Sequence, residues 1–220
     1  MTMDVRMFTV GPIGENCFLI RGEQDPSRAI LVDPGEEAPR LLGAIDELGL
    51  TLEAILLTHT HFDHVGAVAP VARATDAPVW CPELEVPVLQ NINAYVRFPG
   101  FGPFEDWDPE HTVAGGETLQ LAGYDIDVIF TPGHSPGHVT YAIGASADRP
   151  AHLFSGDVLF AGSVGRTDLP GGDYETLLQS IGSLLDRYDD DAIVHPGHMH
   201  ITTLGRERQS NPFLQGTASL

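Results

Sequence analysis

The segment that most constrains the fold is a cluster of metal-binding residue types directly behind a short apolar run. Residues Glu53 to Thr58 are apolar enough for a buried strand, and the chain continues from Thr58 to His64 as T-H-T-H-F-D-H. Three of the ten histidines therefore fall within six residues, together with Asp63. Because ligands gather where strands end and helices begin in α/β proteins, this string predicts a metal site at the end of a strand.

The spacing within the string indicates two binding points. Residues Val65 to Ala74, rich in Ala and Val, predict a helix directly after it. Alternate side chains of an extended segment share one side, so we expect His59 and His61 to face the same point. Asp63 and His64 come where the chain turns, and they can face a second point. One string can therefore serve two metal ions.

Three later apolar runs have the same form as the first. The runs 126–131, 151–155 and 191–194 each lead through a turn that contains Gly to a single His or Asp. Glycine allows such a sharp turn. Nitrogen and oxygen ligands suit two divalent ions, with zinc favoured and iron or manganese also suited. The four strand ends together would supply seven ligands, namely His59, His61, Asp63, His64, His134, Asp157 and His198.

Charge and cysteine content narrow the class of partner. The net charge is −20, and all eleven basic residues are Arg. Solubility explains much of this acidity, yet such a surface repels phosphate, so we expect no nucleic acid and no membrane as partner. Cys17 and Cys81 lie in apolar runs and are predicted to be buried thiols on strands. The sequence has no leader pattern and no apolar window near 18 residues, so a cytoplasmic location is expected.

The order of the motifs carries a family resemblance. The string T-H-x-H-x-D-H, a later G-H, then S-G-D and P-G-H resemble the metallo-β-lactamase fold superfamily. Within it, residues 165–173 and 202–213 resemble the short, single-domain glyoxalase II group. The resemblance runs from about Met7 to Leu214. It implies an α/β fold, a four-layer αββα sandwich with the metal site at one rim. The whole of 1–220 would form one metallo-hydrolase domain, without a separate C-terminal helical domain.

The resemblance also implies roles for the ligands and a reaction. Asp63 and Asp157 are the candidate catalytic residues, the first by accepting a hydrogen bond from a metal-bridging hydroxide and the second by bridging both metals. The hydroxide would attack a thioester carbonyl, and the thiolate would leave with little help from a general acid. The expected function is metal-dependent hydrolysis of S-acyl thiols, with a small-molecule thioester as substrate and the oligomeric state open. The first metal would be held by His59, His61 and His134, and the second by Asp63, His64 and His198.

Four further histidines are given roles outside the set of predicted metal ligands. His138 follows His134 by four residues and is expected to donate a hydrogen bond behind the ligands. His195 is expected to pack or to support a ligand. His111 and His152 have no motif around them, and we expect them to be structural or exposed to solvent.

The parts of the chain that would contact substrate are less defined. The usual Gly-His-Gly-Pro of the family is Gly197-His198-Met199-His200 here. His200 would either fill the Pro position or reach the substrate or an extra metal. Because there is no Lys, the usual glutathione site is expected to be absent. Arg166, Arg206 or Arg208 could bind substrate instead. The aromatic segment from Tyr95 to Trp107 would either cover the site or form its own small hydrophobic cluster.

Four other functions stay open. An iron-dependent persulfide dioxygenase would use one iron held by His59, His134 and Asp157. Residues 165–173 and the segment that ends in Pro212-Phe213 favour the hydrolase instead. A lactonase or a nuclease of the same superfamily is also possible, but the acidity and the missing Lys count against the nuclease. The fourth alternative is a metal-binding module without catalytic activity. It is disfavoured because seven ligands are more than a structural metal site needs.

Overall fold

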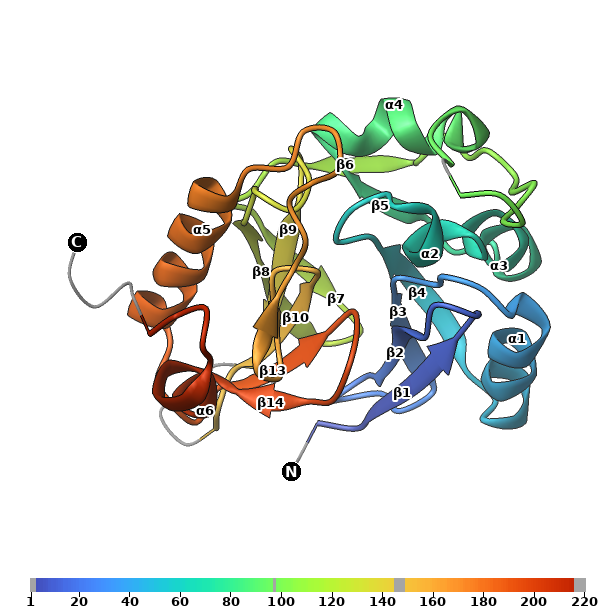
Figure 1. The fold of residues 1–220 in the computed structure, drawn as a ribbon. Coiled ribbons are helices and arrows are strands. Elements are labelled where there is room, and N and C mark those ends of the chain that lie inside the picture. The colour runs from blue at the N-terminus through green and yellow to red at the C-terminus, as the bar shows by residue number, and fades with distance from the viewer. Residues whose placement is uncertain (1–2, 97, 145–148, 216–220) are drawn as a thin grey trace. The chain divides into compact units, whose positions relative to one another are not determined.

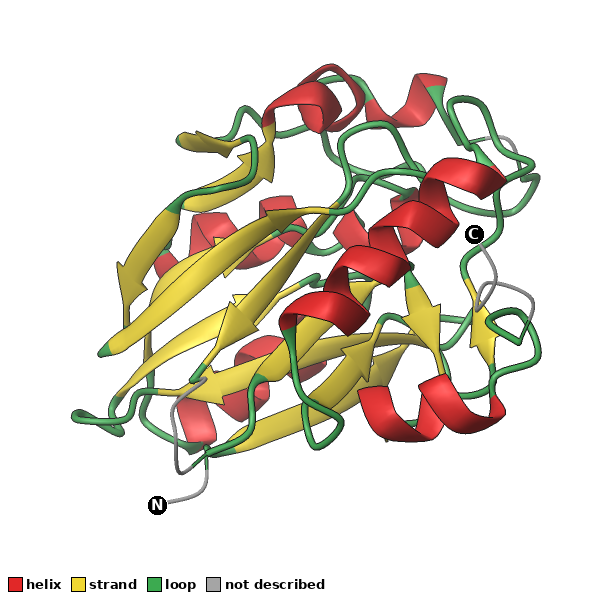
Figure 2. Cartoon of the chain, turned by 90° about the vertical axis from the view of Figure 1, so that its left-hand side faces the viewer, coloured by secondary structure: helices red, strands yellow, loops and turns green. Residues whose placement is uncertain are grey.

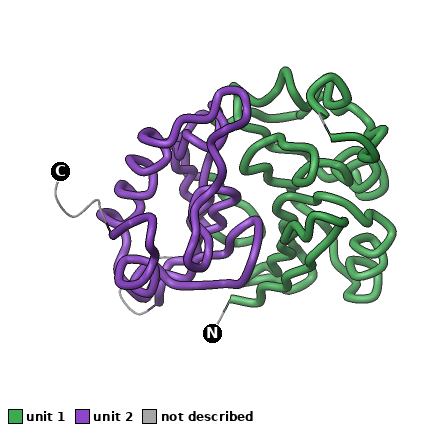
Figure 3. The backbone as a smooth tube through the Cα atoms, in the orientation of Figure 1, with its two compact units in different colours: residues 1–113, 119–124 green, residues 114–118, 125–220 purple. Residues whose placement is uncertain are grey.

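The computed structural model describes residues 3–96, 98–144 and 149–215. The chain divides into two compact units, shown in two colours in Figure 3. The first comprises residues 1–113 and 119–124, and the second comprises residues 114–118 and 125–220. The prediction of one domain over 1–220 stays a prediction.

The first unit contains a mixed six-stranded sheet in the order β1-β2-β3-β4-β5-β6. Strands β1 to β3 are antiparallel, whereas β3 to β6 are parallel. Val32 is paired with Leu56, so the chain leaves β3 and β4 at the same edge. The strands are β1 (Val5–Val10), β2 (Glu15–Arg21), β3 (Arg28–Val32), β4 (Thr51–Leu56), β5 (Val79–Pro82) and β6 (His111–Val113).

Helices α1 and α3 cover one face of this sheet (Figure 1). The core between them contains Leu31, Leu41 and Val71, all at most 1% exposed. Cys17 on β2 and Cys81 on β5 are buried free thiols, which confirms the prediction for both. The helices are α1 (Ala38–Glu47), α2 (Phe62–Val65), α3 (Val68–Thr75) and α4 (Val86–Leu89), with 3-10 turns η1 (Glu83–Glu85) and η2 (Ile92–Ala94).

The predicted helix over Val65 to Ala74 is confirmed from Val68 onward as α3, but it begins later than predicted, because the chain breaks at Gly66 and Ala67 between α2 and α3. The backbone N–H of Ala67 donates to the carbonyl of Pro34 on another segment, over 3.0 Å. Pro70 lacks an N–H, and its ring would clash with the carbonyl four residues earlier in a continuous helix. The break leaves α2 as a separate turn that carries Asp63 and His64.

The second unit is built on a six-stranded sheet in the order β14-β13-β10-β9-β8-β7. Strand β10 is parallel to β13 and antiparallel to β9, which is antiparallel to β8, so β8, β10 and β13 run in one direction. The strands are β7 (Thr118–Leu121), β8 (Tyr124–Phe130), β9 (Val139–Ile143), β10 (His152–Gly156), β13 (Ile193–Pro196) and β14 (Thr202–Thr203), with a hairpin of β11 (Leu159–Phe160) and β12 (Ser163–Val164).

Two helices complete this unit, α5 (Tyr174–Arg187) and α6 (Leu204–Ser210). The view from the side of α5 shows this helix lying across the sheet (Figure 2). The side chain of Asp173 accepts from the backbone N–H of Thr176 and caps the start of α5. Leu177 and Ile181 on its inner face are fully buried. Among the described residues of both units, no helix is long and apolar enough to cross a membrane.

Candidate metal centre

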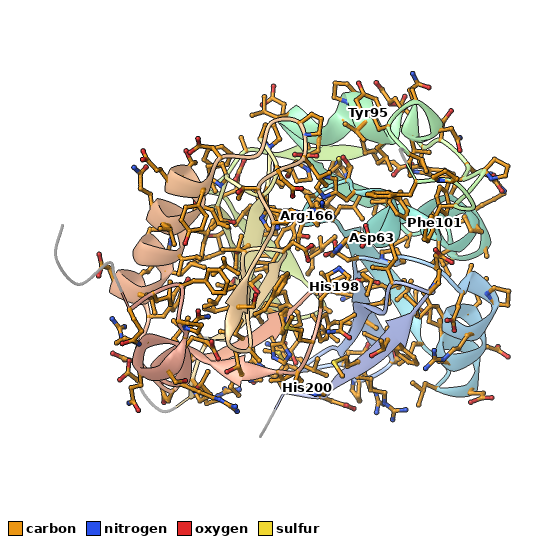
Figure 4. All side chains as sticks on the ribbon, in the orientation of Figure 1. Asp63, Tyr95, Phe101, Arg166, His198 and His200 are labelled. Atoms are coloured by element: carbon orange, nitrogen blue, oxygen red, sulfur yellow. The ribbon has the colours of Figure 1, made fainter. Side chains whose placement is uncertain are left out.

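The first unit brings the histidines of the predicted string together directly after β4. His59 and His64 are fully buried, and their ring centroids are 4.2 Å apart. The Nε2 atom of His59 lies 3.1 Å from the Nδ1 atom of His61. Asp63 follows in the first turn of α2 and is half-buried (Figure 4). His59 thus lies close to both His61 and His64, and Asp63 and His64 lie on α2.

A buried carboxylate holds this cluster in place through hydrogen bonds. Asp33 follows β3 and accepts the hydroxyl proton of Thr58 over 2.6 Å and the Nδ1 proton of His64 over 3.1 Å. The Thr58 hydroxyl donates to Asp33, so its oxygen accepts from Nδ1 of His59, 3.0 Å away. In both histidines the proton is thus held on Nδ1, which leaves Nε2 deprotonated. That is the form in which imidazole binds a metal.

Sequence reasoning did not identify Asp33. Asp33, His59 and His64 are close enough to share a metal ion, with ligand atoms within 4.8 Å of one another. Because the Asp33 carboxylate already accepts from Thr58 and His64, we assign it to holding the imidazoles in place. A signal was present, since Asp33 directly follows the apolar run 29–32 and is itself followed by Pro34-Gly35, a turn signal of the kind found beside the predicted ligands.

The second unit carries the other three predicted ligands behind three strands that run in one direction. Residues His134, Asp157 and His198 follow β8, β10 and β13. The Oδ2 atom of Asp157 lies 3.5 Å from Nε2 of His134 and 3.6 Å from Nε2 of His198. The carboxylate of Asp157 therefore lies between the two imidazoles of this unit, close to both.

The backbone around these ligands fixes their orientation. The Nδ1 atom of His134 donates to the carbonyl of Arg166 over 2.8 Å, which again leaves Nε2 deprotonated. His138 supports Asp157 as an acceptor and not in the predicted role of donor, because its Nε2 accepts from the backbone N–H of Asp157 over 3.1 Å. The proton of His138 is then on Nδ1, which lies 3.1 Å from the Thr131 hydroxyl.

Glycine is required at one position of this unit. A side chain on Gly165 would overlap the carbonyl oxygen of Asp157, and its Cβ would lie 3.2 Å from Nδ1 of His134. The backbone N–H of Gly165 donates to the carbonyl of Val158 over 3.2 Å. The absence of a side chain therefore lets this segment lie directly against two of the predicted ligands.

The remaining histidines lie outside the ligand set. His195 is buried on β13, where its ring stacks on Phe154 and its Nε2 lies 2.9 Å from Nδ1 of His152. Burial, and the neighbouring His152, lower the pKa of His195 to about 3. His111 is exposed, and its ring lies tilted against that of Trp80, with centroids 4.2 Å apart. His200 is exposed on the loop before β14 (Figure 4), and it belongs to no metal-capable cluster in the part of the chain that the structure describes.

The aromatic segment from Tyr95 to Trp107 packs on the ligand turn of the first unit. The ring of Phe62, between His61 and Asp63, has Phe98, Phe101 and Phe104 within 5.9 Å. The Asn93 side chain bonds to both backbone groups of Phe104. The segment thus forms a hydrophobic cluster of its own, one of the two alternatives, with Phe62 as a member. Phe101 and Asp63 are labelled in Figure 4.

Two of the arginines considered for substrate contacts have carboxylate partners. The Arg166 guanidinium donates twice to Asp168, and this pairing lowers the pKa of Asp168 to about 2. Arg208 donates to Asp190 and to the carbonyl of Leu185. Arg206 is exposed on α6.

The donor sets fit divalent metal ions. Each unit presents imidazole nitrogens together with a carboxylate, and three of the imidazoles have Nδ1 directed at a protein oxygen. This combination is typical of metal-binding histidines. The metallo-β-lactamase superfamily model matches residues 10–198. The chain therefore belongs to the metallo-β-lactamase superfamily, whose members use divalent metals, and its predicted fold class is confirmed.

Two curated relatives align over nearly the whole chain. The "hydroxyacylglutathione hydrolase GloC" of Haemophilus influenzae is 38% identical over 96% of this chain and 98% of the relative. The "probable metallo-hydrolase YqgX" of Bacillus subtilis is 40% identical over 97% of this chain and 99% of the relative. These relatives support a metallo-hydrolase.

Three solved structures share the fold. BLEG-1, described as a B3 metallo-β-lactamase, has a TM-score of 0.89 and 37% identity, covering 97% of this chain and 100% of its own. TTHA1623 in a di-iron-bound form has a TM-score of 0.80 and 41% identity, covering 95% and 100%. ETHE1 from Myxococcus xanthus has a TM-score of 0.77 and 26% identity, covering 97% and 85%.

Proposed function

We propose that the protein hydrolyses S-acyl thiols in the manner of glyoxalase II, with a small-molecule thioester as substrate. The observation that carries the proposal is the set of imidazoles whose Nδ1 atoms are directed at protein oxygens, in a member of a metal-dependent superfamily. The relative named hydroxyacylglutathione hydrolase supports this reaction class.

We further propose that the ligands of both units hold the same pair of metal ions. The family model supports this, since its match spans both ligand sets. Zinc is the metal proposed, and the di-iron form of TTHA1623 makes iron the main alternative. When bound, such ions bring the pKa of a coordinated water close to neutrality and polarise a carbonyl oxygen. His59, His61 and His134 would hold the first ion, Asp63, His64 and His198 the second, with Asp157 between them.

The chain's own residues keep these ligands in the metal-binding form. Asp33 holds the Nδ1 proton of His64 and, through Thr58, that of His59. In the second unit, His138 accepts from the backbone of Asp157 and so fixes the position of its carboxylate. Ligands held in this way need little reorganisation when metal binds.

Neither thiol of the chain is suited to attack a substrate. Cys17 and Cys81 are buried, and burial raises the pKa of both well above the ordinary value. Because the thiolate is the nucleophilic form, these cysteines are unreactive near neutral pH. This agrees with a reaction in which water, and not a protein thiol, attacks the carbonyl.

The test combines elemental analysis with a thioester assay. The metal content of the purified protein is measured first, and release of free thiol from several thioesters is then followed with a thiol reagent. We expect two zinc ions per chain and thiol release that stops when a chelator removes the metal. Full metal occupancy without release of thiol from any thioester would contradict the proposal.

Two comparisons favour specific alternatives, and the same preparation tests both. The likeness to ETHE1 fits an iron-dependent persulfide dioxygenase, which predicts one iron per chain and oxygen uptake with a persulfide. The likeness to BLEG-1 favours β-lactam hydrolysis, which predicts ring opening of a chromogenic β-lactam. A protein with one of these activities and no thioesterase activity would replace our proposal.

A further inference from the structure

Met199 holds a strained backbone conformation directly after the ligand His198. Its φ is 69°, in the left-handed region that glycine adopts readily and bulky residues rarely adopt. The residue is the one that replaces the Gly of the family's Gly-His-Gly-Pro motif. Strained backbone conformations of this kind are concentrated at functional sites.

Two of the three side chains after His198, those of Met199 and Ile201, are apolar and open to solvent, and the exposed His200 lies between them. Met199 is 52% exposed and Ile201 is 42% exposed. On the protein side, the ring of Phe160 packs edge-on against His198, with centroids 5.9 Å apart, and Phe160 itself is buried. Apolar side chains therefore lie beside this ligand together with the polar ones, in a chain whose net charge is −20.

We infer that Met199 is a specificity-determining residue that contacts the apolar part of a substrate held beside His198. The inference rests on the proposed function and narrows it to thioesters whose thiol or acyl group is an alkyl or aryl chain. Consecutive Cα atoms are about 3.8 Å apart, so a side chain at 199 lies within a substrate's length of the ligand. A flexible, polarisable thioether suits alkyl and sulfur-containing groups of varied shape.

A binding experiment tests the inference without relying on turnover. Straight-chain alkane thiols, from ethanethiol to octanethiol, are titrated calorimetrically into the metal-loaded protein. They are chosen because the released thiol is a product of the proposed reaction. In the wild type, we expect the Kd to fall by up to about fourfold for each methylene that becomes buried.

Two substitutions at Met199 separate its side chain from its backbone. Asn tolerates the left-handed conformation, so Met199→Asn should keep the Tm of the wild type or raise it. We expect this substitution to raise the Kd of octanethiol by about tenfold and to leave the Kd of ethanethiol nearly unchanged. Met199→Leu should restore the dependence on chain length. The matched control is Met7→Asn, since Met7 is also exposed, at 40%, and lies on strand β1.

The outcomes separate this inference from the proposed function. The same dependence on chain length in Met199→Asn as in the wild type would overturn the role of Met199. So would a wild type whose affinity does not change with chain length. If the thiols bind as expected while no thioester is hydrolysed, the role of Met199 is supported and the proposed reaction fails.

Discussion

The carboxylate of Asp33 accepts the Nδ1 proton of His64 over 3.1 Å, although the two residues are 31 positions apart. Both side chains are nearly inaccessible to solvent, with 2% and 0% exposed. The same carboxylate holds Thr58, whose hydroxyl contacts His59. One buried Asp thus sets the tautomers of two predicted ligands.

The substitution Asp33→Asn is therefore expected to weaken metal binding. The amide would point N–H groups at the donors of Thr58 and His64, so the His64 proton would move to Nε2, the atom that binds metal. Loss of such a supporting carboxylate typically costs about 10- to 100-fold in metal affinity. Competition with a chelator measures this directly. The matched control is Asp76→Asn, because Asp76 is exposed and its φ of 54° is positive like the φ of 47° of Asp33. Equal affinities in both variants would refute the role of Asp33.

Asp157→Ala should lower the occupancy of both metal positions. The carboxylate lies within 3.6 Å of Nε2 of His134 and of His198, and its loss removes a ligand proposed to be shared. Elemental analysis after dialysis against a weak chelator gives the occupancy. Asp189→Ala, an exposed acid of the same unit, serves as the control. If Asp157→Ala keeps two metals and near-normal turnover, the bridging role is wrong.

The stacked pair His152 and His195 predicts a loss of stability in acid. Burial lowers the pKa of both below the ordinary value of 6.5, that of His195 to about 3. Between pH 6.5 and pH 3 the unfolded chain binds more protons than the folded one. The contribution of this pair to the free energy of unfolding is therefore fully present above pH 6.5 and decreases as the pH falls toward 3.

Denaturant unfolding of the metal-free protein at several pH values checks this. His195→Phe keeps a ring on Phe154 but cannot take up a proton. Each histidine held neutral contributes at most about 1.4 kcal/mol per pH unit to the slope, so the variant should show a shallower decline. Parallel profiles for variant and wild type would show that His195 does not contribute.

Glutathione thioesters should be poor substrates. The net charge of −20 repels an anionic carrier, and at least seven of the eleven Arg already pair with a carboxylate. We expect kcat/KM for S-lactoylglutathione to be below that for a small neutral thioester. Added salt should narrow the difference, because it screens the repulsion. A preference for the glutathione substrate that salt does not change would indicate a glutathione site among the arginines or the aromatic segment.

The chemistry of the site was predictable because it is encoded locally. The spacing of His59, His61, Asp63 and His64 follows from the chain's own geometry, as an extended segment leads into a turn. Apolar runs that end in Gly-containing turns placed His134, Asp157 and His198 at strand ends, where the structure has them. The buried cysteines followed from their apolar neighbours.

Contacts between distant segments were decided only by the tertiary structure. Asp33 supports His64 because parallel β3 and β4 end at the same edge, and periodicity does not reveal which strands are neighbours. The break between α2 and α3 depends on a hydrogen bond from Ala67 to Pro34. Toward Asp157, Nε2 of His138 accepts a hydrogen bond because the backbone N–H of Asp157 reaches it. Residue types thus determined which groups can bind metal, whereas the pairing of distant strands determined what holds those groups in place.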